Sequence, residues 1–461
     1  MTSQRIIEVY GMRRIFGLST QYTTKIASTA WLGVVICVGG CQAQSTVESV
    51  TAQHLSDSAQ NGVPKELVAG PWMAWRGPNR NGIVIDQQPV TTWSETENVI
   101  WKTAVPGRGH ASPSIVGDQV ILATSDPEEE TQSVISFDKN TGAENWATVV
   151  NRGNFNPRIY PTNTHASSTV VSDGEQLFAV FNNNGAAQIV ALNLAGKILW
   201  EKEAAKFLPK RYQFGFGSSP VLYKDTVIVS SECERDGSIV ALNKKTGDEV
   251  WRIARDTDTS YSTPVIANVA GKEQLIISGA NATTSYNPAS GEENWRTPGP
   301  WSVTCGTAVW SDDMVFVSGG YPTSRTMGIK ADGSGTVVWE NKAKCYEQSM
   351  LYYEGYIYCL ADTGVAYCWR AEDGKEMWSE RLAGRVSASP VLAGGNIYLA
   401  VENGNTFVFK PSPEGLEIVA ENQLGDSAYA TPTFIDNRIY MRVADGPQRD
   451  QQEWLYCLGS Q

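Results

Sequence analysis

The chain is a succession of short apolar or alternating runs that are separated by turn residues. Residues 238–242 (SIVAL) and 248–251 (DEVW) are two such runs. Between paired runs, an Asp or Asn usually comes shortly before a glycine, as in residues 137–142 (FDKNTG). Asx side chains favour tight turns, and glycine supplies the positive φ that ends them. The pattern therefore predicts β-hairpins along most of the chain.

A tryptophan ends most of these hairpins, four residues after a glycine. Successive tryptophans lie 39 to 54 residues apart, and in the last copy Val419 takes the place of the tryptophan. Because a cofactor needs one site and not seven, we interpret these tryptophans as structural residues that hold neighbouring units together. The series comprises Trp101, Trp146, Trp200, Trp251, Trp295, Trp339 and Trp378.

A second marker precedes each hairpin: a small residue, a Ser or Thr, often a proline, and then an apolar run. The preceding residue is small in seven of eight copies, and proline follows in five. Proline fits a strand only where its missing N–H has no partner, as in an edge strand. Small residues fit where strands of many units converge, so we place this marker on the innermost strand of each unit. The hydroxyl positions are Ser112, Ser167, Ser219, Thr263, Thr307, Ser349, Ser389 and Thr431.

Units of about 40–45 residues with four strands each are typical of β-propellers. We therefore predict an all-β fold, an eight-bladed β-propeller of four-stranded antiparallel blades, over residues 71–461. The last unit ends after three strands, and the strand predicted at residues 98–105 has no unit of its own. We expect this N-terminal outer strand to complete blade eight and close the ring.

The repeated segments resemble pyrroloquinoline-quinone (PQQ) repeats, whose pattern is AxDxxTGxxxW. Residues 72–461 as a whole resemble the exported PQQ-like propeller family, in stretches such as residues 75–78 (WRGP), 215–220 (GFGSSP) and 260–264 (SYSTP). The resemblance implies an eight-bladed ring. The family includes quinoprotein alcohol dehydrogenases and outer-membrane assembly lipoproteins of the BamB type, so the resemblance alone leaves the function open.

The N-terminus has the pattern of an export signal. Basic residues precede an apolar stretch over residues 26–40, and residues 38–41 (VGGC) resemble a bacterial lipobox. We therefore expect a signal peptide over residues 1–40, a lipid on Cys41 and a flexible tether over residues 41–70. The alternative is ordinary cleavage nearby without a lipid. With a lipid anchor, the protein would lie on the periplasmic face of a bacterial membrane.

Composition excludes several classes of protein. The 461 residues carry a formal net charge of −12, which argues against a nucleic-acid binder because such proteins need Lys and Arg at phosphates. No apolar run reaches about 18 residues, which excludes a polytopic membrane protein. Three histidines are too few for a multi-histidine metal centre. Export would permit disulfides, and whether Cys359 bonds to Cys368 in the same hairpin depends on the strand register.

One position varies from unit to unit although the motif around it is kept, namely the residue two before the hydroxyl. In a propeller, these positions should ring one mouth of the central channel. They form the candidate ligand ring: His110, His165, Tyr261, Cys305, Glu347 and Tyr429. We interpret the ring either as contacts for a small polar ligand or peptide, or as polar residues that face channel water. A metal site is disfavoured, because Glu347 lies far around the ring from the two histidines.

Two loops, at residues 151–164 and 203–216, combine aromatic residues with Arg or Lys in an acidic chain. Each joins the tryptophan strand of one blade to the hydroxyl strand of the next, which places both on the face of the candidate ring. Aromatic and Arg side chains are typical interface hot spots. Either these side chains dock a partner, or the aromatic rings fold back onto the blades. The candidate partner face comprises Phe155, Arg158, Tyr160, Arg211, Tyr212 and Phe214.

The resemblance also allows a comparison of this sequence with the catalytic site of the resembling dehydrogenases. The resembling dehydrogenases place the quinone against a disulfide of adjacent cysteines and a tryptophan, with a Ca²⁺ on acidic and amide ligands and a catalytic Asp. This chain has no adjacent cysteines, and Glu347 is the only carboxylate of the candidate ring. We therefore expect no catalytic residues, no metal and no cofactor.

These patterns favour a monomeric, non-catalytic scaffold that binds envelope proteins and no nucleic acid. Partners would bind to the loop face or by β-augmentation at exposed strand edges. By resemblance, the scaffold would act in outer-membrane protein assembly. The alternative is a PQQ-dependent quinoprotein dehydrogenase with a degenerate site, which would use PQQ and Ca²⁺.

Overall fold

The computed structural model describes residues 67–255, 258–382, 384–447 and 450–460. All described residues belong to one compact unit of the chain. The expected signal peptide, the lipid site at Cys41 and the expected tether up to residue 66 therefore lie outside the described residues. Within the described ranges, we find no helix with the length and apolar character needed to cross a membrane.

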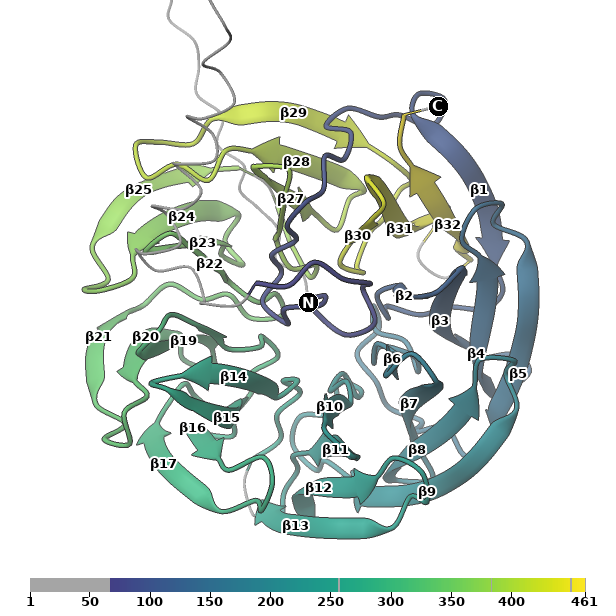
Figure 1. The fold of residues 1–461 in the computed structure, drawn as a ribbon, viewed down its shortest axis with the longest axis horizontal. Coiled ribbons are helices and arrows are strands. Elements are labelled where there is room, and N and C mark those ends of the chain that lie inside the picture. Colours follow the sequence, from purple (N-terminus) through teal and green to yellow (C-terminus); the bar gives the residue numbers. More distant parts are fainter. Residues whose placement is uncertain (1–66, 256–257, 383, 448–449, 461) are drawn as a thin grey trace, which may run out of the picture. The chain divides into compact units, whose positions relative to one another are not determined.

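The described residues form eight four-stranded antiparallel sheets, which lie as blades around a central axis (Figure 1). Seven blades take their four strands consecutively from the chain. Blades one to three comprise β2 (Ser114–Val116), β3 (Gln119–Asp126), β4 (Thr131–Asp138) and β5 (Glu144–Arg152); β6 (Val171–Ser172), β7 (Gln176–Asn183), β8 (Ala186–Asn193) and β9 (Ile198–Lys206); and β10 (Val221–Tyr223), β11 (Thr226–Ser231), β12 (Gly237–Asn243) and β13 (Glu249–Arg255).

Blades four to seven follow the same order from the innermost to the outermost strand. They comprise β14 (Val265–Val269), β15 (Lys272–Gly279), β16 (Ala282–Tyr286) and β17 (Glu293–Pro298); β18 (Val309–Trp310), β19 (Met314–Gly319), β20 (Arg325–Lys330) and β21 (Val337–Asn341); β22 (Leu351–Tyr353), β23 (Tyr356–Leu360), β24 (Val365–Arg370) and β25 (Glu376–Arg381); and β26 (Val391–Ala393), β27 (Asn396–Ala400), β28 (Asn405–Phe409) and β29 (Ile418–Gln423).

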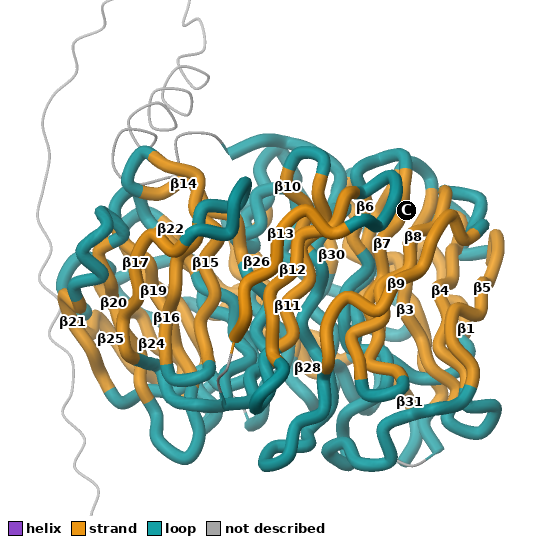
Figure 2. The backbone as a smooth tube through the Cα atoms, turned by 90° about the horizontal axis from the view of Figure 1, so that it is seen from below, coloured by secondary structure: helices purple, strands orange, loops and turns teal. Residues whose placement is uncertain are grey.

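The strands run between the two faces of the ring, and loops cover both faces (Figure 2). Antiparallel order puts the loops that join consecutive blades on one face, together with the turns between the second and third strands. We call this the mouth face. The opposite face, which carries the other two turns of each blade, is the back face.

Blade eight closes the ring with strands from both ends of the propeller sequence. It consists of β30 (Thr433–Ile435), β31 (Arg438–Asp445), β32 (Gln452–Leu458) and, as its outer strand, β1 (Val99–Val105). β1 is antiparallel to β32, with Val105 opposite Glu453 and Val99 opposite Leu458. The predicted eight-bladed fold and its closure by an N-terminal outer strand are confirmed.

The repeated Asx–Gly–Trp pattern builds the contact between neighbouring blades. The Asp138 carboxylate accepts hydrogen bonds from the backbone N–H groups of Asn140 (2.9 Å) and Thr141 (2.8 Å), and Gly142 then adopts a φ of 72°. The indole of Trp101 from blade eight packs directly on this glycine, since a Cβ on Gly142 would lie 2.5 Å from Trp101 Cε3. Position 142 therefore needs glycine both for its backbone conformation and for the room it leaves.

The structure places all seven tryptophans of the series on outer strands, against the neighbouring blade. Six of them donate the indole N–H to a backbone carbonyl of the next blade, at 2.7–3.3 Å. The exception is Trp295, which donates to Gln274 of its own blade (2.8 Å). These contacts are structural, and they leave the indole rings outside the central channel.

The hydroxyl positions form a ring of hydrogen bonds around the axis. At seven of the eight junctions between blades, the backbone N–H of one hydroxyl residue donates to the hydroxyl oxygen of the next, at 2.9–3.2 Å. At the remaining junction, Thr307 accepts a hydrogen bond from the indole N–H of Trp75 (2.9 Å). The Ser or Thr of the marker therefore joins the innermost strands of neighbouring blades.

One predicted member of this ring is wrong. In blade two, Thr169 and not Ser167 holds the position, because Thr169 accepts the N–H of Ser112 and donates its own N–H to Ser219. Thr169 also lies two residues before its inner strand, as the hydroxyl residue does in the other blades. Blade two offers three consecutive hydroxyls at residues 167–169 without a following proline, so the sequence did not distinguish them.

Removing one hydroxyl of this ring should leave a buried N–H without an acceptor. Ser389 is fully buried and accepts the N–H of Ser349 (2.9 Å). We expect Ser389→Ala to lower the free energy of unfolding by about 1–3 kcal/mol, as measured by chemical denaturation. Ser389→Thr, which keeps the hydroxyl as other blades do, should cost clearly less. Equal stability of the alanine variant and the wild type would contradict a role for the hydroxyl.

Residues 72–84, which we call the cap segment, cross the middle of the ring (Figure 1). The carbonyls of Trp72 and Met73 accept the N–H groups of Ile115 (2.7 Å) and Ser172 (2.8 Å), which lie in the inner strands of blades one and two. On the other side, the carbonyl of Gly82 accepts the N–H of Leu392 in blade seven (2.8 Å). These contacts lie at the back-face ends of the inner strands, so the cap segment closes the channel on that side.

The strand register of blade six shows whether Cys359 and Cys368 lie opposite each other. Tyr358 lies opposite Cys368, and Tyr367 lies opposite Cys359, so the two cysteines are not partners across the hairpin. All six cysteines in the described part of the chain are free thiols.

Candidate binding site

A cavity of about 530 Å³ opens on the mouth face at the centre of the ring. Its floor is formed by Trp75 of the cap segment and by hydroxyl residues of the inner ring: Ser112, Ser219, Thr263 and Thr431. The volume lies in the range of ligand sites, about 300–1,000 Å³. Because the cap segment closes the back face, the cavity is a blind funnel rather than a through channel.

The wall of the cavity consists of the positions two residues before the hydroxyls. With Thr169 as the hydroxyl of blade two, this position in that blade is Ser167, and all eight such residues line the cavity: His110, Ser167, Gly217, Tyr261, Cys305, Glu347, Ser387 and Tyr429. The structure therefore brings together five of the six residues of the candidate ligand ring.

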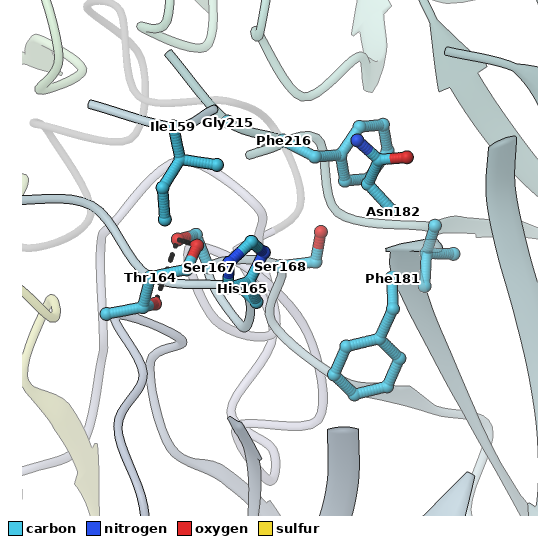
Figure 3. A pocket seen from close by; sticks show the side chains of 10 residues that line it. Ile159, Thr164, His165, Ser167, Ser168, Phe181, Asn182, Gly215 and Phe216 are labelled. Carbon is cyan, nitrogen blue, oxygen red and sulfur yellow. Dashed lines mark hydrogen bonds between the residues drawn. The ribbon is translucent and has the colours of Figure 1, made fainter. Parts of the chain in front are cut away.

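His165, the sixth residue, does not lie in the central cavity. It lines a smaller hole between blade two and the loop that leads to blade three, with Thr164, Asn182 and Phe216 (Figure 3). The volume of this hole is about 10 Å³, which is room for about one water molecule and no larger ligand. The ring of His165 also packs against Phe155, with centroids 4.4 Å apart, and burial lowers its pKa. The prediction that His165 belongs to the ligand ring is wrong, because it followed from the misplaced hydroxyl.

Three carboxylates, Glu347, Asp362 and Glu402, gather on the side of the cavity formed by blades six and seven, and we call them the acidic wall. The hydroxyl oxygen of Ser387 lies 2.7 Å from Glu347 Oε2 and 2.9 Å from Glu402 Oε1. A hydroxyl has one proton to donate, so it satisfies only one of these two carboxylates at a time.

Glu347 is exposed at the cavity mouth, but its surroundings raise its pKa. The neighbouring protein displaces part of its hydration, which raises the pKa, and the negative charges of Glu402 and Asp362 raise it further, while Ser387 and Arg385 act in the opposite direction. Asp362 is better compensated, because it accepts the N–H of Tyr346 (2.8 Å) and pairs with Lys344 (3.1 Å).

His110 contributes an uncharged aromatic face to the cavity wall at the junction of blades one and eight. It stacks on Tyr429, with ring centroids 4.3 Å apart and an interplanar angle of 18°. Burial lowers the pKa of His110 to about 3, and the positive charges of Arg442 and Arg108 add to this effect. His110 is therefore neutral at physiological pH and supplies no cation to a ligand.

The lowered pKa of His110 predicts a loss of stability in acid. Below about pH 6.5, this histidine becomes protonated in the unfolded chain, whereas in the folded protein it stays neutral down to about pH 3. We expect the free energy of unfolding of His110→Gln to fall less steeply with decreasing pH than that of the wild type. The difference should reach up to about 1.4 kcal/mol per pH unit between pH 6 and 4. Parallel pH curves for the two proteins would show that His110 titrates normally.

The two loops of the candidate partner face lie on the mouth face, and both sequence alternatives occur in them. Phe207 folds back into the core and is 1% exposed. Tyr160 and Phe214, in contrast, line the cavity mouth, and Tyr160 is 46% exposed. Arg158 and Arg211 are exposed farther out on the same loops, and Phe155 is half-buried against His165. The loops thus combine an anchored base with accessible aromatic and Arg side chains.

A continuous set of aromatic rings surrounds one side of the mouth, and we call Tyr160, Tyr212, Phe214 and Tyr321 the aromatic rim. Ring centroids of neighbours are 5.8–5.9 Å apart, from Tyr160 to Phe214, from Phe214 to Tyr212, and from Tyr212 to Tyr321. Tyr321 lies in a turn of blade five, is 47% exposed and was not predicted from the sequence.

Asp362, Arg385 and Glu402 also line the cavity and were not predicted from the sequence. Asp362 and Glu402 follow the second strands of blades six and seven, each two residues before a glycine with positive φ. This acid-x-Gly turn, repeated in adjacent units as residues 362–364 (DTG) and 402–404 (ENG), is the signal that could have found them.

The cavity does not fit the quinone site that the resemblance implies. Cys305 is a single free thiol in the cavity wall, so no disulfide of adjacent cysteines is available there. In the described ranges, no group of three or more His, Cys, Asp or Glu side chains could hold a metal ion. The acidic wall would also repel a quinone that itself carries carboxylates. Trp75 offers an aromatic floor, but that feature alone does not make a quinone site.

Comparison with known proteins places the chain among PQQ-like propellers. The family model for outer membrane protein assembly factor BamB matches residues 68–206, 130–321 and 329–410. A crystal structure of BamB from Moraxella catarrhalis is similar in fold, with a TM-score of 0.56 and 16% identity over 79% of this chain and 97% of that one.

Two kinds of relative are similar in sequence. The chain is 22% identical over 317 residues to outer membrane protein assembly factor BamB of Burkholderia pseudomallei, which covers 68% of this chain and 66% of the relative. It is 28% identical over 204 residues to methanol dehydrogenase (cytochrome c) subunit 1 of Methylorubrum extorquens, which covers 39% of this chain and 29% of that subunit. The matches thus span just under two thirds of the first relative and less than one third of the second.

Proposed function

Because the chain belongs to the family of outer membrane protein assembly factor BamB, we propose that it is a non-catalytic propeller scaffold that binds envelope proteins during outer-membrane protein assembly. The observation that carries this proposal is the mouth face, where a blind cavity is bordered by exposed aromatic side chains. Accessible aromatic side chains beside Arg are the usual anchors of protein–protein interfaces.

An envelope location fits this role. The relative from Burkholderia pseudomallei is named for outer-membrane assembly, and the N-terminus of this chain has the pattern of an export signal. We propose that residues 1–40 are removed and that Cys41 carries a lipid, which would hold the propeller on the periplasmic face of a membrane. The closed ring leaves the outer strand of each blade as a further edge at which a partner strand could add.

The second candidate function is a quinoprotein dehydrogenase. It is supported by the match to the methanol dehydrogenase subunit. The acidic wall and the single thiol Cys305 argue against it.

The proposal is tested by deleting the gene in the source bacterium and measuring the abundance of folded β-barrel proteins in its outer membrane. We expect the deletion to lower their abundance and the full chain to restore it. A chain with Phe214→Ala and Tyr321→Ala should restore it poorly. Glu372→Gln, an exposed change in a back-face turn, serves as the matched control and should restore it fully. Unchanged barrel proteins in the deletion strain would refute the assembly role.

A further inference from the structure

The cavity mouth has two unlike sides that face each other. The aromatic rim comes from loops of blades two to five, and the acidic wall comes from blades six and seven. Trp301, which is 47% exposed, lies beside Gly320 and extends the aromatic side outward onto the surface. Tyr160, Phe214 and Tyr321 of the rim line the same cavity as the acidic wall, and Trp301 continues the aromatic side onto the exposed surface. An arrangement that runs from the cavity onto the surface suits a peptide segment.

The protein itself supplies only part of the hydrogen-bond donors and positive charge that the carboxylates of the acidic wall can accept. Ser387 bridges Glu347 and Glu402 with a single hydroxyl proton, so one of the two carboxylates, which are exposed and half-buried, is left to water or to a ligand. The positive charge of Arg385, which lines the same cavity, acts on Glu347 from a distance, and among the described residues Arg385 forms no ion pair within 4 Å. The positive charge of Lys344 is already bound to Asp362. A cationic side chain entering the cavity would meet Glu347 and Glu402 as acceptors.

Charge on the rest of the mouth face would orient such a segment. Arg158 and Arg211 are exposed on the outer edge of the aromatic side and would repel a basic residue there. His110 is neutral and stacked on Tyr429, so it opposes no cation inside the cavity. The favourable place for a basic side chain is therefore the acidic wall, with an apolar neighbour on the aromatic rim.

We propose that the mouth face binds an extended peptide segment of an envelope partner, in which a lysine or arginine enters the cavity to pair with Glu347 and Glu402 while an aromatic residue close to it in the segment packs on Tyr160, Phe214 and Tyr321. This inference rests on the proposed scaffold function and specifies the chemistry of the partner. Charge-assisted hydrogen bonds inside a partly desolvated cavity are among the stronger polar contacts, and aromatic packing adds area at low entropic cost.

The experiment is a calorimetric titration of the full chain, purified in detergent, with two peptides. One is the acetylated and amidated peptide Ser-Phe-Gly-Lys-Gly-Phe-Ser, and the other has norleucine in place of lysine. We expect saturable binding of the lysine peptide, with a Kd lower than that of the norleucine peptide by about tenfold or more. Added salt should weaken only the lysine peptide appreciably.

Variants locate the site. Glu347→Gln and Glu402→Gln, made singly and together, should raise the Kd of the lysine peptide by about tenfold or more and leave the norleucine peptide unaffected. Phe214→Ala and Tyr321→Ala should weaken both peptides, and the back-face control Glu372→Gln should weaken neither. Thermal unfolding will show whether the double variant folds. If it does not, the two single variants still test the proposal.

Several outcomes would overturn the inference: no binding of the lysine peptide, equal affinity for the two peptides, or unchanged binding by both single variants. Saturable binding of Ca²⁺ or of lysine amide that displaces the peptide would also overturn it, since the cavity would then be a small-cation site. The scaffold proposal would survive each of these results, because the deletion strain tests it separately.

Discussion

Replacing Glu453 with alanine is expected to be among the most damaging single changes in the propeller, at about 3–5 kcal/mol of the free energy of unfolding. Glu453 and Arg442 are each 3% exposed and lie on neighbouring strands of blade eight. Glu453 accepts the N–H of Gly109 (2.9 Å), and Arg442 donates to the carbonyl of Ala123 in blade one (2.7 Å). The change would leave a buried guanidinium without its carboxylate where the ring closes.

The matched control for this prediction is an exposed ion pair of the same chemistry. Glu293 and Arg296 lie 2.7 Å apart on an outer strand of blade four, with side chains 40% and 44% exposed. Water screens such a pair, so Glu293→Ala should cost less than about 1 kcal/mol. Both values are read from chemical denaturation at neutral pH. If Glu453→Ala cost no more than Glu293→Ala, the buried pair would not be what holds blade eight to blade one.

Trp101→Ala is expected to cost about 3–5 kcal/mol, because it leaves a large hole between the last and first blades. Trp101 is 8% exposed, donates its indole N–H to the carbonyl of Lys139 (3.1 Å) and packs on Gly142. Trp301→Ala, which removes a tryptophan that is 47% exposed, is the control and should change stability little.

A double-mutant cycle separates the packing of Trp101 on Gly142 from the backbone requirement at that glycine. Gly142→Ala alone should be strongly destabilising, because its Cβ would clash with the indole and its φ is positive. In the presence of Trp101→Ala the clash disappears, so the second change should cost clearly less than it does alone. Additive costs would show that the glycine is needed only for its φ.

The propeller could be predicted from the sequence because its signals repeat in chemistry as well as in spacing. The Asx–Gly–Trp turns and the Ser or Thr of the inner strand each make the same contact in nearly every blade. The missing outer strand of the last unit and the unpaired strand near residue 99 then required closure across the chain ends. The turn signal and the inner-strand signal each depend on a few neighbouring residues and have one physical explanation.

The candidate site was predicted only in part, for two physical reasons. Residues 167–169 offer three hydroxyls, and only the path of the loop before β6 decides that Thr169 bonds to its neighbours and that His165 lies elsewhere. Glu402 and Tyr321 reach the cavity from turns of different blades, so their proximity depends on the closed ring and not on their spacing. A repeat fixes positions along one blade, whereas a site at the axis combines positions from all of them.

The central claim is that the cavity serves partner binding and not quinone chemistry. It is tested most directly by calorimetric titration of the full chain with PQQ in the presence of excess Ca²⁺, followed by visible absorption. We predict no saturable heat and no spectral change, because the acidic wall and the single thiol Cys305 do not suit the quinone. Saturable one-to-one binding that is lost in Glu347→Gln would contradict the claim and assign the cavity to a quinoprotein.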